Sequence, residues 1–213
     1  ANANLDTVFR SAVDKLRGST VTGNDLVLTI RPAVQALALR ALQGKCGAVV
    51  ALEPKTGRVL VMATSPTYNP NLIEKRFAQA TRTHSRCRSP LLNRATAGRY
   101  TPGSIFKIIT AAAALDTGRF TPDSPFYDPG YCIEYGQRVR NAGNPEAPET
   151  FGSVNLTTGF EHSINSVFCN IGKALGAGPI LRYAERFGFY SLPPLETPEN
   201  ERVESGLYNR SRL

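Results

Sequence analysis

Ser104 and Lys107 stand three residues apart in the segment Thr101-Pro102-Gly103-Ser104-Ile105-Phe106-Lys107. Residues spaced i and i+3 on a helix share one face, so the hydroxyl and the amine would be neighbours. A serine becomes a nucleophile when a base takes its proton, and a lysine can be that base if its amine is neutral. The pair therefore predicts acyl transfer through Ser104, with Lys107 as the base.

A neutral Lys107 requires a large change in its pKa. If half of the amines are to be neutral at pH 7, the pKa must fall from about 10.4 to about 7, which corresponds to about 4.6 kcal/mol. A helix N-terminus contributes only ~0.3 to 1 kcal/mol of this. Desolvation and a second nearby cation must supply the rest. The structural alternative makes Ser104 a helix N-cap and Lys107 a residue that reaches out to solvent.

Two Ser-x-Asn sequences offer a second hydroxyl and an amide, one over residues 153–155 and one over residues 163–165. Asn155 directly precedes a predicted helix, where a role as N-cap explains it. Ser163 and Asn165 lie instead at a break between two predicted helical segments. Short polar side chains can project from such a break into a cleft, so Ser163 and Asn165 are the catalytic candidates.

The surrounding sequence predicts a mixed α and β structure that would position these residues. Two apolar runs, 48–52 and 59–63, flank a turn-forming segment and predict a β-hairpin, and a short strand is expected over residues 25–30. Residues 64–99 and 119–152 predict mainly loops, and no element is expected after residue 189. Helical spacing is found over residues 4–16, 32–42, 72–80, 104–115, 155–162, 167–175 and 178–187.

The charge favours an acidic partner or surface. The 213 residues include 25 Lys and Arg against 17 Asp and Glu, a net charge of +8. No zinc-finger, helix-turn-helix or RNA-binding signature accompanies this charge, so nucleic acid is not predicted as a partner. The densest basic cluster is interpreted as a solvated loop; it consists of Arg82, Arg86, Arg88, Arg94 and Arg99.

Composition and cysteine spacing exclude several other classes. Hydrophobic residues make up 41% of the chain, which is typical of a folded globular protein. The longest apolar run, residues 108–115, is far shorter than the ~20 residues that span a bilayer. The four cysteines form no Cys-x-x-Cys pair, and His84-x-x-Cys87 lacks a second pair of ligands. We therefore predict neither a metal nor a cofactor.

The two motifs together give the chain a family resemblance. The segment 101–107, followed by His162-Ser163-Ile164-Asn165-Ser166, resembles the transpeptidase domain of class B penicillin-binding proteins of the actinobacterial PbpA type. The resemblance covers essentially the whole chain. Further stretches that resemble the family, in the family's order, are 23–30, 49–57, 65–70 and 91–95.

The resemblance implies a fold and a set of roles. The fold would be the α/β (α+β) fold shared with serine β-lactamases, a mostly antiparallel sheet with a helical subdomain. Ser104 would be acylated by the D-Ala-D-Ala end of a peptidoglycan stem peptide, or by a β-lactam, and its backbone N–H would be one oxyanion donor. Lys107 would take the Ser104 proton. Ser163 would relay a proton to the leaving amine, and Asn165 would hold the substrate amide and the Lys107 ammonium.

One family motif is not found in its place. The family carries a Lys-Thr-Gly strand after Ser-x-Asn, and none follows Asn165 here; Lys55-Thr56-Gly57 precedes the nucleophile and lies in the predicted hairpin turn. We expect residues 1–22 to be a linker and helix from a non-catalytic region. Residues 23–213 are expected to be the N-terminal part of a transpeptidase domain, truncated at its C-terminus, and the isolated chain would have an incomplete cleft and an exposed sheet edge.

The resemblance also implies a location and partners. The family works at the outer face of the cytoplasmic membrane, anchored by an N-terminal segment, on stem peptides and a lipid-linked precursor, beside cell-division or elongation proteins. A basic surface would suit such a substrate. Disulfides are permitted at that location, and Cys132 with Cys169 is the expected pair, closing a loop worth roughly 3 to 4 kcal/mol.

Three other functions use or retain the same motif. A class A β-lactamase needs Ser-Asp-Asn, where this chain has Ile164, and neither Glu196 nor Glu199 fits its Glu-x-x-Leu-Asn pattern. We therefore expect a long-lived acyl-enzyme. A penicillin-sensing or class D β-lactamase-like domain is the nearer alternative, and a non-catalytic assembly module is the third.

Overall fold

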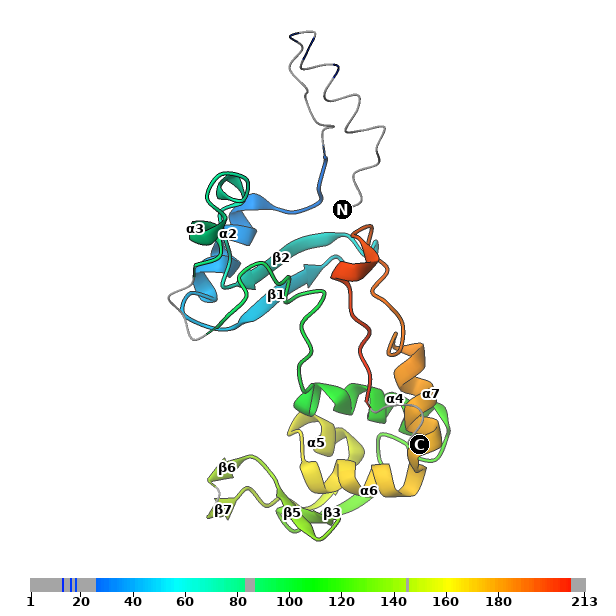
Figure 1. The fold of residues 1–213 in the computed structure, drawn as a ribbon. Coiled ribbons are helices and arrows are strands. Elements are labelled where there is room, and N and C mark those ends of the chain that lie inside the picture. The colour runs from blue at the N-terminus through cyan, green and yellow to red at the C-terminus, as the bar shows by residue number, and fades with distance from the viewer. Residues whose placement is uncertain are drawn as a thin grey trace.

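The computed structural model describes residues 26–82, 87–144 and 146–207, together with Val13, Leu16 and Gly18. The helix predicted over residues 4–16 lies almost wholly outside the described residues, and so does His84. Figure 1 shows two lobes. We call residues 26–97 the hairpin lobe and residues 103–188 the helical lobe. No helix in the described part of the chain has the length and apolarity to cross a membrane.

The hairpin lobe contains the predicted hairpin and one covering helix. Strands β1 (Gly47–Leu52) and β2 (Val59–Ser65) pair antiparallel, and Gly57 allows the turn between them because its φ is +73°. Helix α2 (Pro32–Ala41) starts at a proline, as predicted. Its Gln35 side chain bonds both backbone groups of Met62, at 2.7 and 2.9 Å. The small core consists of Ala38, Leu42, Val61 and Ala63.

The strand predicted over residues 25–30 is absent from the described residues 26–30. Leu26 and Val27 are 80% and 93% exposed. This segment touches β2 only at its end, where the Thr29 hydroxyl donates to the Val59 carbonyl and the Arg31 N–H to the Leu60 carbonyl. The prediction was wrong because a strand needs a ladder of backbone hydrogen bonds to its neighbour, and residues 26–30 make no backbone–backbone hydrogen bond to β2.

The connection after β2 is mostly irregular, as predicted. The short helix expected over residues 72–80 is divided into η1 (Pro70–Leu72) and α3 (Phe77–Ala80). Arg94 corrects the interpretation of the basic cluster as a solvated loop, because it is only 9% exposed. Its guanidinium donates to the carbonyl oxygens of Arg88 and Ser89, so this arginine closes a turn.

The helical lobe holds most of the buried apolar side chains. Its helices are η2 (Gly103–Phe106), α4 (Lys107–Asp116), α5 (Leu156–Glu161), α6 (Asn165–Leu175) and α7 (Ala177–Arg186). As predicted, the Asn155 side chain caps α5 by accepting from the Thr158 N–H at 2.9 Å. One continuous core joins the longer helices; it includes Ile109, Ala113, Ile164, Val167, Ile171 and Ala184.

Short antiparallel strands occupy part of the region where the sequence predicts loops. The pairs are β3 (Pro125–Asp128) with β8 (Gly152–Asn155), β4 (Tyr131–Glu134) with β5 (Gln137–Arg140), and β6 (Gly143–Asn144) with β7 (Ala147–Pro148). Strands of two to four residues carry too little alternation to be recognised. In Figure 1 β3 and β5 lie below α6, on the side away from α4, and β6 and β7 lie to the lower left.

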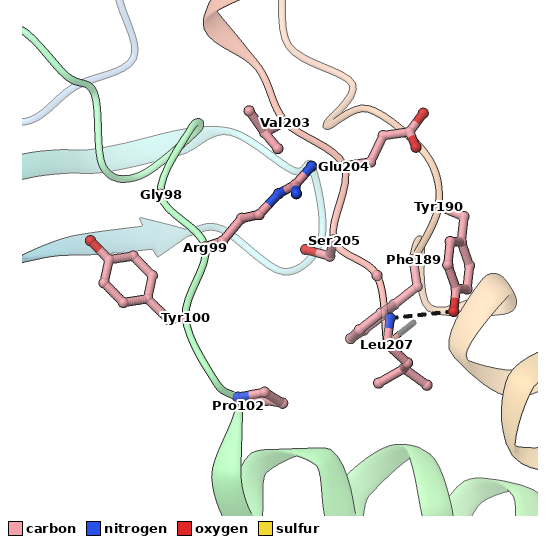
Figure 2. A pocket seen from close by; sticks show the side chains of 11 residues that line it. Gly98, Arg99, Tyr100, Pro102, Phe189, Tyr190, Val203, Glu204, Ser205 and Leu207 are labelled. Carbon is pink, nitrogen blue, oxygen red and sulfur yellow. Dashed lines mark hydrogen bonds between the residues drawn. The ribbon is translucent and has the colours of Figure 1, made fainter. Parts of the chain in front are cut away.

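In the described part of the tail, residues 190–207, η3 (Glu199–Glu201) is the only helix or strand, but this part packs back on the molecule. The Val203 N–H donates to Thr96 in the hairpin lobe at 3.0 Å, and the Tyr190 N–H donates to Ser205 at 2.7 Å. A cavity of about 670 Å³ lies between this tail and residues 98–102. Figure 2 shows it, with the Tyr190 hydroxyl bonded to the Leu207 N–H at 3.3 Å.

Candidate active site

Ser104 lies on the single turn of 3-10 helix that precedes α4. Gly103 begins this turn with a φ of +56°, a conformation that glycine adopts without strain. The Ser104 side chain is exposed. Among the described residues it caps no helix, because the ends of η2 and α4 have no side-chain cap. The N-cap alternative for Ser104 is therefore not supported, and its hydroxyl is accessible to a substrate.

Lys107, Ser163 and Asn165 come together at the start of α4 and α6. The Lys107 ammonium donates to the Ser163 hydroxyl at 2.9 Å, to the Asn165 side-chain oxygen at 2.6 Å, and to the Ser163 carbonyl. These three acceptors use all three N–H groups of a charged lysine. In the described structure Ser104 makes no hydrogen bond to Lys107. The ammonium must lose one proton before the amine can receive the Ser104 proton.

Burial lowers the pKa of Lys107 below its ordinary value. The direction agrees with the requirement for a neutral base, and the cause is desolvation. The ring of Phe168 lies 5.3 Å from the ammonium and favours its charged form. The second cation that the sequence argument required is not among the described residues that contact Lys107.

The backbone at Ser163 is bent to bring both of its oxygens to Lys107. Ser163 has a φ of +54°, which is uncommon for a residue other than glycine. It follows α5 and precedes α6, so it occupies the predicted break between helices. Gly159 allows α5 to approach α6 closely, because a Cβ atom there would lie 2.7 Å from a methyl group of Val167. This close packing fixes where Ser163 emerges.

A buried polar network behind Asn165 was missed by the sequence analysis. Asp128, at the end of β3, is 0% exposed and accepts hydrogen bonds from Ser166 and Asn141 at 2.6 and 2.8 Å. Asn141 in turn accepts the backbone N–H of Asn165 at 2.9 Å. Only a single aspartate at the end of a four-residue strand, before Pro-Gly, marked this position in the sequence.

Each lobe contains one disulfide. Cys132 is bonded to Cys169, which confirms the expected pair and ties β4 to α6 one turn after Asn165. Cys46 is bonded to Cys87. The sulfur atoms of Cys132 and Cys169 and a carboxylate oxygen of Glu134 lie within 4.8 Å of one another. Because the two sulfurs are joined, they are not thiolates that could bind a metal.

A cavity of about 540 Å³ opens beside Lys107 and Asn165. Its walls are mainly apolar, with Phe168 and Ile180 from the helices and Val139 and the exposed Tyr135 from the β4–β5 hairpin. The larger cavity in Figure 2 reaches the nucleophile turn only through Pro102. The smaller one is lined by Lys107 and Asn165 but not by Ser104.

An exposed serine, a half-buried lysine one turn later, and a Ser-x-Asn pair bonded to that lysine form the arrangement expected of a serine acyl-transferase with a lysine base. Residues 47–205 match the family model of the penicillin-binding protein transpeptidase domain, and the chain belongs to that family. The resemblance predicted from the two motifs is thereby confirmed.

The relatives are peptidoglycan D,D-transpeptidases. The chain is 36% identical over 202 residues to PbpA of Mycolicibacterium smegmatis, covering 87% of this chain and 40% of that protein. It is 37% identical over 201 residues to PbpA of Mycobacterium tuberculosis, covering 89% and 40%. The chain thus spans about two fifths of the length of these curated relatives.

Solved structures confirm the fold. The imipenem acyl-enzyme complex of penicillin-binding protein A from M. tuberculosis superposes with a TM-score of 0.71, at 35% identity, over 90% of this chain and 46% of that chain. Its ceftriaxone acyl-enzyme complex gives a TM-score of 0.75, at 34% identity, over 95% and 47%. The predicted mixed α/β penicillin-binding protein fold is therefore correct.

Proposed function

We propose that this chain provides the nucleophile, base and proton relay of a serine D,D-transpeptidase that cross-links peptidoglycan stem peptides. The observation that carries the proposal is the convergence of Ser163 and Asn165 on the Lys107 ammonium, one turn after an exposed Ser104. The acyl-enzyme complexes of the related M. tuberculosis protein support the same chemistry.

The proposed reaction has two acyl transfers. Neutral Lys107 takes the Ser104 proton while the serine oxygen attacks the carbonyl of the penultimate D-alanine. The Lys107 ammonium then passes a proton through Ser163 to the amine of the departing D-alanine, which leaves an ester on Ser104. The amine of a second stem peptide attacks that ester and gives up a proton through Ser163 to Lys107. The new amide bond replaces the ester bond, and Lys107 returns a proton to the released Ser104 oxygen.

Asn165 has two tasks in this scheme. Its side-chain oxygen accepts from Lys107 at 2.6 Å and thereby stabilises the ammonium that forms in each half-reaction. Its side-chain nitrogen donates to the Arg140 carbonyl at 2.6 Å, which holds the amide group in one orientation. Contact with the substrate amide is the second task, and a cavity of about 540 Å³ opens beside Asn165.

The setting is proposed from the family. The basic charge of +8 suits a polymer with carboxylates and a lipid-linked precursor. We place the reaction at the outer face of the cytoplasmic membrane, in a protein anchored there and working with division or elongation proteins. The domain boundary at residue 23 stays a prediction.

The test is intact-protein mass after incubation with benzylpenicillin, for this chain and for the full-length protein. We expect a stable adduct of one benzylpenicillin on the full-length protein, and none on its Ser104→Ala variant. Rapid release of the hydrolysed drug would favour the β-lactamase alternative. No adduct on well-folded full-length protein would favour the non-catalytic assembly module.

A further inference from the structure

Asp128 is completely buried and its carboxylate is fully bonded. One oxygen accepts from the Gly130 N–H at 2.9 Å and from the Ser166 hydroxyl at 2.6 Å. The other accepts from the Asn141 side chain at 2.8 Å and from the Phe151 N–H at 3.0 Å. These four donors come from the β3–β4 turn, the chain after β5, the chain before β8, and the first turn of α6.

The local sequence builds this arrangement. Asp128-Pro129-Gly130 forms a tight turn in which Gly130 has a φ of +86°. A Cβ atom at Gly130 would lie 2.8 Å from the Thr150 hydroxyl, so the close approach of the chain at residue 150 requires glycine. The turn thus points the Gly130 N–H back at Asp128.

Asn141 links this carboxylate to the candidate site. Its side-chain nitrogen donates to Asp128 and to the Glu149 carbonyl at 3.0 Å, so its side-chain oxygen faces the Asn165 N–H at 2.9 Å. An aspartate next to that nitrogen permits only one orientation of the Asn141 amide, because an ionised carboxylate accepts and cannot donate. The same carboxylate holds Ser166, the residue after Asn165, through its hydroxyl.

The charge on Asp128 is maintained by its donors. Burial would raise the pKa of the Asp128 carboxyl, but the hydrogen bonds from Ser166, Gly130, Phe151 and Asn141 outweigh it and hold the pKa below its usual value. Asp128 is therefore an acceptor at neutral pH, which its four partners require.

We infer that Asp128 is a positioning residue for acyl transfer, acting through Asn141 and Ser166 to fix the start of α6 so that Asn165 faces Lys107. The inference deepens the proposed function and rests on it. Asp128 touches neither the substrate nor a reacting atom. Two hydrogen bonds connect it to the Asn165 backbone, one from Asn141 to Asp128 and one from the Asn165 N–H to Asn141. A third, from the Lys107 ammonium to the Asn165 side chain, completes the connection to the base.

The test compares Asp128→Asn, Asn141→Asp and the double variant in the full-length protein. In Asp128→Asn the new NH₂ group must face one of the existing N–H donors. In Asn141→Asp two carboxylates meet. Either change displaces Asn165, and we expect the acylation rate by a fluorescent penicillin, per folded molecule, to fall about 10- to 100-fold, as for a misplacement of about 1 Å. The double variant restores a donor–acceptor pair with exchanged roles, so it should recover part of that rate.

Two controls separate positioning from stability. Asp116→Asn removes an exposed carboxylate bonded to Tyr183 and Arg186, far along α4 from the site, and should leave the acylation rate unchanged. Leu175→Ala removes buried volume from the far end of α6 and should lower the urea midpoint without lowering the acylation rate per folded molecule.

If Asp128→Asn does not fold, Asn141→Asp provides the test, because Asp128 keeps three hydrogen-bond donors in that variant. Folded variants acylated at the wild-type rate would overturn the inference.

A second readout needs no catalysis. Competitive labelling of amines with acetic anhydride, read by mass spectrometry at several pH values, reports the pKa of Lys107. When Asn165 no longer accepts from it, the ammonium loses a partner, and the pKa should fall in Asp128→Asn and Asn141→Asp. An unchanged Lys107 profile in these variants would contradict the role of Asp128. A wild-type protein that labels normally but is never acylated would contradict only the proposed function.

Discussion

The hairpin lobe and the helical lobe bury very different amounts of apolar surface. The core of the hairpin lobe consists of Ala38, Leu42, Val61 and Ala63. That of the helical lobe joins twelve buried residues from α4, α5, α6, α7 and the residue before α6. Each lobe has one disulfide, and the loops they close have similar lengths, 41 and 37 residues. The disulfide therefore provides a larger share of the stability of the hairpin lobe.

The candidate site belongs wholly to the better-packed lobe. Ser104 and Lys107 stand at the start of α4, and Ser163 and Asn165 stand at the start of α6. These two helices pack against each other through the core, so their first turns are held at a fixed separation. We conclude that packing in the helical lobe sets the geometry of the reacting groups, and that the hairpin lobe acts on them only indirectly.

The largest expected effect tests this separation with one substitution in each core. Ile171→Ala should cost about 2 to 5 kcal/mol, because it leaves a cavity at a 0% exposed position in α6. Val61→Ala, in β2, should cost about 1 to 3 kcal/mol, because it removes two buried methyl groups. Hydrogen exchange should show faster opening of α6 amides in the first variant and of β2 amides in the second.

The control for this pair is the hydrogen-exchange rate of amides in the lobe that does not carry the substitution. If Val61→Ala accelerates exchange in α6 as much as Ile171→Ala does, the lobes unfold as one unit and the comparison fails. Acylation by a fluorescent penicillin gives a functional counterpart, and it should decline with the stability of α6 rather than with that of β2.

A smaller effect is expected where α5 meets α6. Gly159→Ala places a methyl group 2.7 Å from Val167 and should cost about 1 to 3 kcal/mol through overpacking. Because α5 leads directly into Ser163, we also expect slower acylation. Combining it with Val167→Ala makes room for the new methyl group and should restore part of both losses, as measured by urea unfolding and by acylation rate.

Gly172→Ala is the matched control for that prediction. Gly172 lies within α6, and a Cβ atom there would have no heavy atom within 4 Å. The substitution should stabilise the helix by about 0.5 to 1 kcal/mol, since alanine is the better helix former. Equal destabilisation by both substitutions would show that the contact with Val167 is not the cause.

The sequence was sufficient to predict those elements whose ends are determined by neighbouring residues. The hairpin of β1 and β2 follows from two apolar runs around Gly57, α2 from Pro32, and the start of α5 from its Asn155 cap. The break at Ser163 also followed from the pattern. Spacing alone does not distinguish the two Ser-x-Asn sequences, but the position of Ser163 between helices did.

The features that could not be predicted from the sequence depend on contacts between residues that are far apart in the chain. The apolar run at residues 26–30 looks like a strand, yet whether it becomes one depends on a partner far away in the sequence. Asp128 is a single charged residue without periodicity, and its importance arises only when Asn141 and Ser166, 13 and 38 residues later, meet its carboxylate. Arg94 is similar, because its burial depends on the turn that it closes.

The smallest expected effect concerns the charge at the site. Burial lowers the pKa of Lys107 in the folded protein, so the folded state releases this proton at a lower pH than the unfolded chain. Below the lowered pKa Lys107 is charged in both states, and the folded state bears the full free-energy cost of burying that charge. As the pH rises from that value toward the ordinary 10.5, the unfolded chain binds more protons, and the free energy of unfolding should increase.

Lys107→Met isolates this contribution, because it keeps most of the side-chain volume and removes the titrating group. Urea unfolding of both proteins across the alkaline range should show the wild type gaining stability relative to the variant as the pH rises. The gain should be small, since Lys107 is only partly buried and water screens its charge. Parallel profiles would mean that the folded and unfolded proteins titrate Lys107 alike. In that case burial in the helical lobe does not lower the pKa of Lys107, and the second cation required for a neutral base must supply the shift.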